Sequence, residues 1–69
     1  EFAVKEDSAV TGIPLSDLRL KNNLLVASIN RGGVIHIPRG QDIIQPGDTV
    51  IIVTTVKGLN DLTDILAGR

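Results

Sequence analysis

The middle of the chain contains three apolar, β-branched segments that are separated by glycine and proline. They are residues 24–29, residues 34–37 and residues 49–54. Gly32-Gly33 lies between the first two segments, and Pro46-Gly47 precedes the third. β-branched residues favour strands, and glycine and proline favour the turns that connect strands. The sequence therefore predicts a three-stranded antiparallel unit.

The first turn is compatible with two loop lengths. A two-residue loop at Gly32-Gly33 places Ile29 opposite His36, whereas a three-residue loop that includes Arg31 places Ile29 opposite Ile35. We prefer the three-residue loop, because it separates an apolar face from a polar face and gives a glycine the left-handed position. In this register Ala27, Ile29, Ile35 and Ile37 face the helices, and Val26, Ser28, Asn30 and His36 face away, with Ser28 opposite His36.

The third segment, extended to residues 49–56, is apolar on both faces, since Val50 and Ile52 alternate with Ile51 and Val53. Burial on both faces is typical of a central strand or of one that another chain covers. Asp48 precedes this strand, and we interpret it as the cap of the Pro46-Gly47 turn rather than as a chemical group.

The flanking segments complete a two-layer α+β domain. Residues 1–5 alternate as a short strand, and residues 12–20 predict a short helix with Pro14 in its first turn and asparagines at its end. Residues 59–66 predict a second helix, whose apolar stripe consists of Leu59, Leu62, Ile65 and Leu66. The predicted order is β-α-β-β-β-α, with a four-stranded, mostly antiparallel sheet.

Composition limits the possible functions. The chain has 69 residues, 42% of them hydrophobic, and Phe2 is its single aromatic residue. Aliphatic residues must therefore form a small core, and a second subunit is a source of further burial. The net charge is −1, the basic residues are scattered, and no apolar run approaches about 18 residues. These features argue against nucleic-acid binding and against direct membrane insertion. The chain starts with Glu1, which suggests a fragment of a longer protein.

No residue set predicts catalysis or metal binding. The chain has no cysteine and one histidine, which excludes cysteine or polyhistidine metal sites. The three serines have no base near them in sequence, and no phosphate-binding glycine loop is present. We therefore expect a protein that is not an enzyme, without catalytic or metal-binding residues.

An ordered set of short motifs resembles a known family. The motifs are Gly12-Ile13-Pro14-Leu15-Ser16-Asp17-Leu18, residues 25–33, Ile37-Pro38, and Gln45-Pro46-Gly47-Asp48 followed by residues 49–53. Together they resemble the TrkA-C domain, the C-terminal half of RCK (regulator of potassium conductance) proteins, with residues 1–69 as one such domain. The resemblance implies a cytoplasmic regulatory domain, membrane-associated only through a potassium transporter or channel subunit, and present as a homodimer.

The resemblance also implies a ligand site. Some family members bind cyclic di-AMP at the dimer interface, whereas the nucleotide cofactor of the family belongs to a Rossmann domain that this chain lacks. The matching positions for the ligand are Asp17, Leu18 and Arg19, then Val26 and Ser28, and then His36 and Pro38. An arginine and a histidine beside a phosphate, with aliphatic walls for adenine, form a workable anion site.

The sequence is also compatible with two alternative functions. One is a purely structural dimerisation domain of a transporter. The other is an ACT-like small-molecule sensor of a metabolic enzyme, which also places two helices on a four-stranded sheet. The predicted element order differs from the βαββαβ order of that fold.

Overall fold

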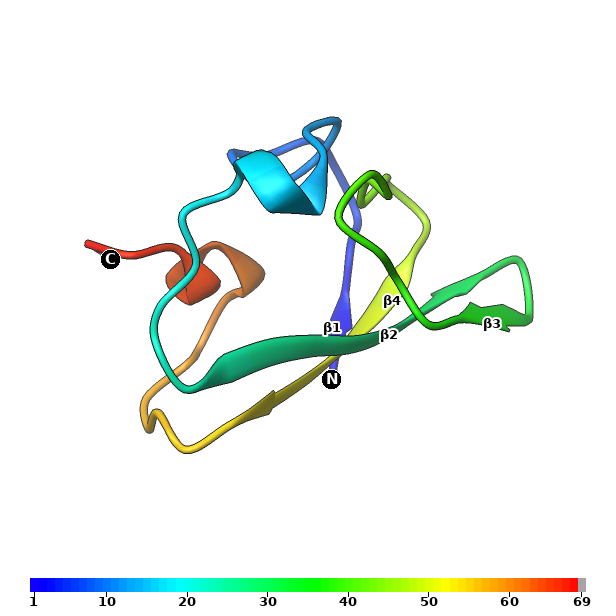
Figure 1. Cartoon of the computed structure of the whole chain (residues 1–69). Helices are drawn as coiled ribbons and strands as arrows, with labels where there is room; N and C mark the ends of the chain where they lie inside the picture. Colours follow the sequence, from blue (N-terminus) through cyan, green and yellow to red (C-terminus); the bar gives the residue numbers. More distant parts are fainter. Residues whose placement is uncertain (69) are drawn as a thin grey trace.

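The computed structural model describes residues 1–68, which form one antiparallel sheet with the remaining chain packed on one side of it (Figure 1). The strands are β1 (Phe2–Ala3), β2 (Leu24–Arg31), β3 (Val34–His36) and β4 (Thr49–Thr54). Their order in the sheet is β1-β4-β2-β3. This order confirms the predicted four-stranded sheet, and β4 is an interior strand, as its apolar sequence predicted.

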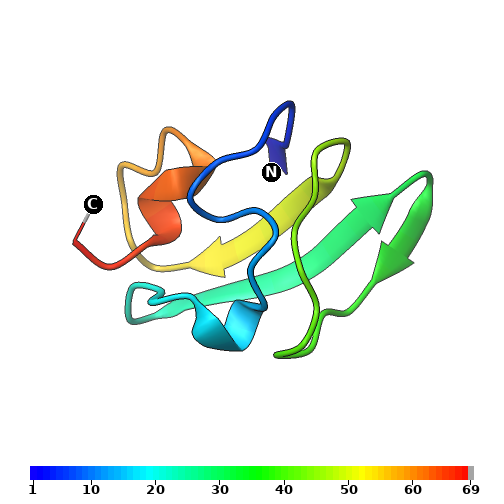
Figure 2. The same ribbon diagram turned by 90° about the horizontal axis from the view of Figure 1, so that it is seen from above.

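The prediction of two α-helices is wrong. The structure has only two short 3-10 turns at these places, η1 (Leu15–Asp17) and η2 (Leu62–Ile65). Helices of this length have marginal stability without tertiary contacts, and here the backbone groups form hydrogen bonds with distant segments instead. Figure 2, seen from above, shows η1 beside the outer edge of β2 and η2 beside the end of β4.

Backbone bonds to distant segments end both turns. The residues after η1 become extended, so that Leu20 pairs with Leu66, and Lys21 donates to the carbonyl of Ile65 over 2.8 Å. Asn23 lies at the end of this segment and has the left-handed conformation, with a φ of 60°, which asparagine tolerates.

The predicted apolar stripe in the last segment is nevertheless buried. Leu62 and Ile65 belong to the core, and Leu59 and Leu66 pack against it. A 3-10 helix has about three residues per turn, so residues three apart share a face, as they nearly do in an α-helix. The spacing therefore identified the buried residues although it did not distinguish the two helix types.

The register of the first hairpin also corrects the prediction. β2 and β3 are joined by the two-residue loop, which sets Ile29 opposite His36 and Asn30 opposite Ile35. Gly32 and Gly33 both have positive φ angles, of 60° and 85°, as a two-residue hairpin of the primed type requires.

A bulge at Ala27 changes which side chains of β2 reach the core. Val26 pairs with Ile52 and Ser28 pairs with Ile51, so the alternation shifts by one residue between them. Val26 and Ile29 are both buried as a result, on the face that η1 and η2 cover. Of the predicted inward residues, Ile35 and Ile37 are instead exposed, and Val26, predicted to face away, lies in the core.

The core is entirely aliphatic, as the composition predicted. Its fully buried members come from four separate segments of the chain and are Val10, Ile44, Val50 and Ile65. Val10 and Ile44 lie outside the strands, which shows that the loops over the sheet complete its hydrophobic layer.

Candidate ligand-binding groove

A shallow groove lies beside the first half of β2, where β2 has no neighbour on its outer side. β3 pairs only with residues 29–31 of β2. The groove has a volume of about 230 Å³ and its walls are mostly apolar; its lining residues are Leu15, Ser16, Leu20, Leu24, Leu25, Val26, Pro38, Arg39 and Gly40. It is therefore formed by η1, by the start of β2 and by the loop that follows β3.

Backbone hydrogen bonds hold two walls of the groove together. Leu15 and Ser16 donate to the carbonyls of Asp42 and Gly40, both over 2.9 Å. Asp42 also accepts a bond from the backbone N–H of Arg39 through its Oδ2 over 2.7 Å. A Cβ atom at Gly40 would lie 3.1 Å from the Cβ of Ser16, so this glycine permits the close approach of loop and turn.

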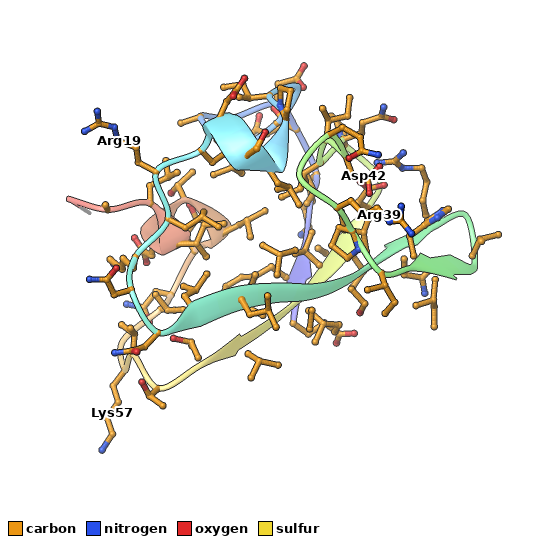
Figure 3. The ribbon with its side chains drawn as sticks, viewed as in Figure 1. Arg19, Arg39, Asp42 and Lys57 are labelled. Atoms are coloured by element: carbon orange, nitrogen blue, oxygen red, sulfur yellow. The ribbon has the colours of Figure 1, made fainter. Side chains whose placement is uncertain are left out.

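Arg39 provides positive charge at the rim of the groove. Its side chain is exposed, and the one ion pair found within residues 1–68 joins Arg31 to Asp48 instead. Figure 3 shows Arg39 near Asp42, above the β2–β3 end of the sheet, and Arg19 pointing outward at the opposite side. An apolar groove with an arginine at its rim can hold a flat or aliphatic group that carries an anion.

The Arg31–Asp48 pair connects the end of β2 to the turn before β4. Asp48 is 1% exposed, and its two carboxylate oxygens accept bonds from Nε and Nη2 of Arg31, both over 2.8 Å. Arg31 also donates to the carbonyl of Ile43, and Asp48 accepts from the N–H of Gln45 over 2.9 Å. The predicted capping role of Asp48 is confirmed, while its pairing with Arg31 was not predicted.

The TrkA-C domain family matches residues 1–67, which is nearly the whole chain. The chain belongs to the TrkA-C domain family. This assignment confirms the resemblance that the ordered motifs indicated, and it gives no support to the ACT-like alternative.

Curated relatives of this TrkA-C domain carry transport names. It is 40% identical over 65 residues to a Trk system potassium uptake protein TrkA homolog of Archaeoglobus fulgidus, which covers 94% of the chain and 15% of that protein. It is 31% identical over 69 residues to homolog 2 of Methanosarcina mazei, covering 100% of the chain and 15% of that protein. It is 33% identical over 67 residues to a Trk system potassium uptake protein TrkA homolog of Pyrococcus horikoshii, and the match covers 96% of the chain and 29% of that protein. The chain thus spans less than a third of each of these relatives.

The structure brings together some of the seven predicted ligand residues and separates others. Val26 and Pro38 line the groove, and His36 lines a neighbouring cavity of about 100 Å³ that shares Pro38 with it. Leu18 packs against the core, and Asp17 and Arg19 are exposed. Ser28 lies on the other face of the sheet from Val26, because of the bulge, so the prediction that Val26, Ser28 and His36 share one face is wrong.

Sequence reasoning missed Ser16, Arg39 and Gly40 of this TrkA-C domain. The break at Pro38-Arg39-Gly40 was visible as a turn signal. The contact of this loop with η1 depends on hydrogen bonds between residues more than twenty positions apart, and no local sequence pattern indicates such bonds.

A larger cavity, of about 350 Å³, lies between residues 3–8 and residues 61–63. Glu6, Asp7 and Asp61 are among its lining residues. No group of three or more His, Cys, Asp or Glu side chains is arranged for a metal ion in the described part of the chain, residues 1–68. Within the same residues, no helix is long and apolar enough to cross a membrane.

The domain should lose stability in acid through Asp48. The bonds from Arg31 hold the pKa of Asp48 below its usual range; burial opposes this effect, and the Gln45 N–H and the charge of His36 add to it. A carboxyl whose pKa is lowered by folding stabilises the fold fully above its unfolded pKa of about 3.9, and this contribution disappears as the pH falls through the folded pKa. The free energy of unfolding should therefore fall below about pH 5.

Urea unfolding between pH 2 and pH 7 measures this dependence. The Asp48→Asn variant is the control, and it should show a shallower acid slope than the parent. The pKa of Arg31 is raised by the same pair, so Arg31 stays charged throughout this range. Equal slopes for parent and variant would show that Asp48 does not drive the acid sensitivity.

Proposed function

We propose that this TrkA-C domain is a regulatory, ligand-sensing module of a potassium uptake system that acts as a homodimer in the cytoplasm. The names of the relatives support the transport assignment, and they refer to potassium uptake rather than to a catalysed reaction. The chain covers only part of those proteins, so a transporter or channel subunit is the partner of the whole protein in this proposal.

The ligand in this proposal is cyclic di-AMP, and the groove beside β2 is the observation that carries it. Its walls contain Val26 and Pro38, two positions at which the family resemblance implied ligand contacts. Small-molecule sites are concave and mostly apolar, with a few polar groups that fix orientation. Leu15, Leu20 and Leu24 supply aliphatic surface for an adenine ring, and Arg39 supplies charge-assisted hydrogen bonds to a phosphate.

A two-fold dimer gives the remaining predicted residues a role. A two-fold symmetric ligand can make equal contacts with both subunits of an isologous dimer. Asp17, Arg19 and Ser28 do not line the groove of their own subunit. In the proposal their contacts reach the ligand from the second subunit, while His36 acts from the cavity next to Pro38.

Calorimetric titration of the chain with cyclic di-AMP tests this function. Arg39→Ala and Arg19→Ala should each weaken binding at least tenfold, since a charged hydrogen bond contributes about 1.5–3 kcal/mol. Lys57→Ala is the matched control, because Lys57 is exposed, points away from the domain and is not among the residues that line the groove (Figure 3). It should bind as the parent does. Absence of heat at high micromolar ligand would contradict the proposal, and so would equal affinities for all three variants.

A second candidate function is structural dimerisation without a ligand. The observation in its favour is the apolar face of the sheet that no part of the described chain, residues 1–68, covers. A dimer that forms in solution but gives no heat with cyclic di-AMP would support this candidate over the first.

A further inference from the structure

The loop after β3 forms one wall of the groove, and a tight turn over residues 39–42 closes it. The backbone N–H of Asp42 donates to the carbonyl of Arg39 over 3.0 Å, and Oδ2 of Asp42 accepts the N–H of Arg39 over 2.7 Å. Both polar backbone groups of Arg39 are therefore bonded to one residue. A carboxylate is a stronger acceptor than a neutral oxygen, so the side chain of Asp42 forms the stronger of the two bonds.

The same turn joins the loop to η1. The carbonyl of Asp42 accepts the N–H of Leu15, and the carbonyl of Gly40 accepts the N–H of Ser16, both over 2.9 Å. Leu15 and Ser16 line the groove from η1, and Gly40 lines it from the loop. Because both carbonyls belong to one four-residue turn, a change in the shape of the turn moves both of them. The turn therefore sets how far apart the two walls of the groove lie.

The core contributes little to the position of this turn. Residues 39–41 are exposed, and Asp42 is only half-buried. The next fixed points along the chain are Ile43, whose carbonyl accepts a bond from Arg31, and Ile44, which is fully buried. A segment with few buried apolar contacts opens easily unless specific hydrogen bonds hold it. The bonds of Asp42 are thus the main constraint on this wall.

We propose that Asp42 is a positioning residue of the ligand groove, which holds Pro38 and Arg39 where the ligand of the proposed function needs them. This inference rests on the proposed function and adds a residue that supports the groove from outside. Asp42 does not line the groove; it lines the neighbouring small cavity, together with His36 and Pro38. Its carboxylate bonds to the backbone of Arg39, and the one ion pair found between residues 1 and 68 does not involve Arg39. The guanidinium group is therefore available for an anion.

The bonds of Asp42 affect affinity through pre-organisation. A wall that is already in place does not have to be ordered when the ligand binds, which saves free energy of binding. Without the carboxylate, the N–H of Arg39 loses its acceptor, and the turn can open so that its carbonyls leave η1. The apparent affinity then falls in proportion to the population of the closed arrangement.

Amide hydrogen exchange, measured by NMR on the ligand-free chain, tests the positioning directly. Asp42→Ala should raise the exchange rates of the Leu15 and Ser16 amides by at least about fivefold, the factor that corresponds to one ordinary hydrogen bond. A general loss of stability would instead raise the rate of Val50, in the interior strand β4, by the same factor. Asp42→Asn should restore the slow exchange, because its side-chain oxygen can accept the same bond without a charge.

Calorimetric titration with cyclic di-AMP measures the effect on binding. Asp42→Ala should weaken binding about fivefold, whereas Asp42→Asn should bind within about twofold of the parent. Glu6→Ala is the matched control, because it removes an exposed carboxylate that does not line the groove. It should change neither the affinity nor the two exchange rates.

The two measurements separate the role of Asp42 from the identity of the ligand. Equal exchange rates of Leu15 and Ser16 in the parent and in Asp42→Ala would overturn the inference, and so would an Asp42→Asn variant that behaves like Asp42→Ala. A parent that gives no heat would contradict the proposed ligand, while selective exchange in Asp42→Ala would still show that Asp42 holds the wall. If Asp42→Ala does not fold, Asp42→Glu replaces it, because it keeps the charge and moves the carboxylate away from the N–H of Arg39.

Discussion

Asp48→Ala should lower the free energy of unfolding by about 1–3 kcal/mol, because it removes a buried acceptor from its donors, whereas the Arg31 side chain, 40% exposed, can bind water in its place. Asp48 is almost fully buried and accepts three hydrogen bonds, two from Arg31 and one from the backbone of Gln45. A domain of this length has a total stability of only roughly 3–10 kcal/mol. The variant should therefore have a clearly lower urea midpoint than the parent.

Asp17→Ala provides the matched control for this measurement. Asp17 is exposed on η1, and surface substitutions of this kind change stability by at most about 0.5 kcal/mol. Arg31→Met is the complementary variant, because it leaves the buried Asp48 carboxylate with only the Gln45 N–H as a donor. It should be clearly less stable than the parent. Similar urea midpoints for Asp48→Ala and Asp17→Ala would show that the pair does not stabilise the fold.

Leu62→Ala should lower the free energy of unfolding by about 2–5 kcal/mol, the range for large-to-small changes in a core. Leu62 is 6% exposed and lies in the same cluster as Ile65, Val50 and Ile29. Truncation removes apolar contacts and leaves a cavity, because η2 is held on both sides. Asp61 and Asp64 form a capping box at its start, and the N–H of Lys21 bonds to the carbonyl of Ile65.

Denaturant midpoints of Leu62→Ala and Ile13→Ala give the comparison. Ile13 lies in a loop and is 37% exposed, so its truncation should cost clearly less than that of Leu62. A loss below about half a kcal/mol for Leu62→Ala would show that the last segment contributes little to the core.

The local sequence was sufficient to locate the strands and the positions of the turns between them. The β-branched segments indicated β2, β3 and β4, and the unbroken apolar character of the last placed it inside the sheet. Gly47, with a φ of 94°, and Asn23 occupy turn conformations that few other residues adopt. The spacing of Leu62 and Ile65 likewise predicted their burial. These features depend on neighbours in the chain, and the residues involved have strong local preferences.

Only the tertiary structure decided the helix type, the sheet register and the groove. Residues 12–20 end as a single turn because their N–H groups bond to residues 40–42 and their continuation pairs with Leu66. The bulge at Ala27 shifts the alternation of side chains in β2. As a result Val26 lies in the core, and Ser28 lies on the opposite face of the sheet. Arg39 reaches the groove, and Arg31 meets Asp48, through loops that a local pattern cannot place. Local structural preferences are weak in a chain of 69 residues. The structure that forms is the one in which distant segments satisfy each other's backbone hydrogen bonds and bury a common aliphatic core.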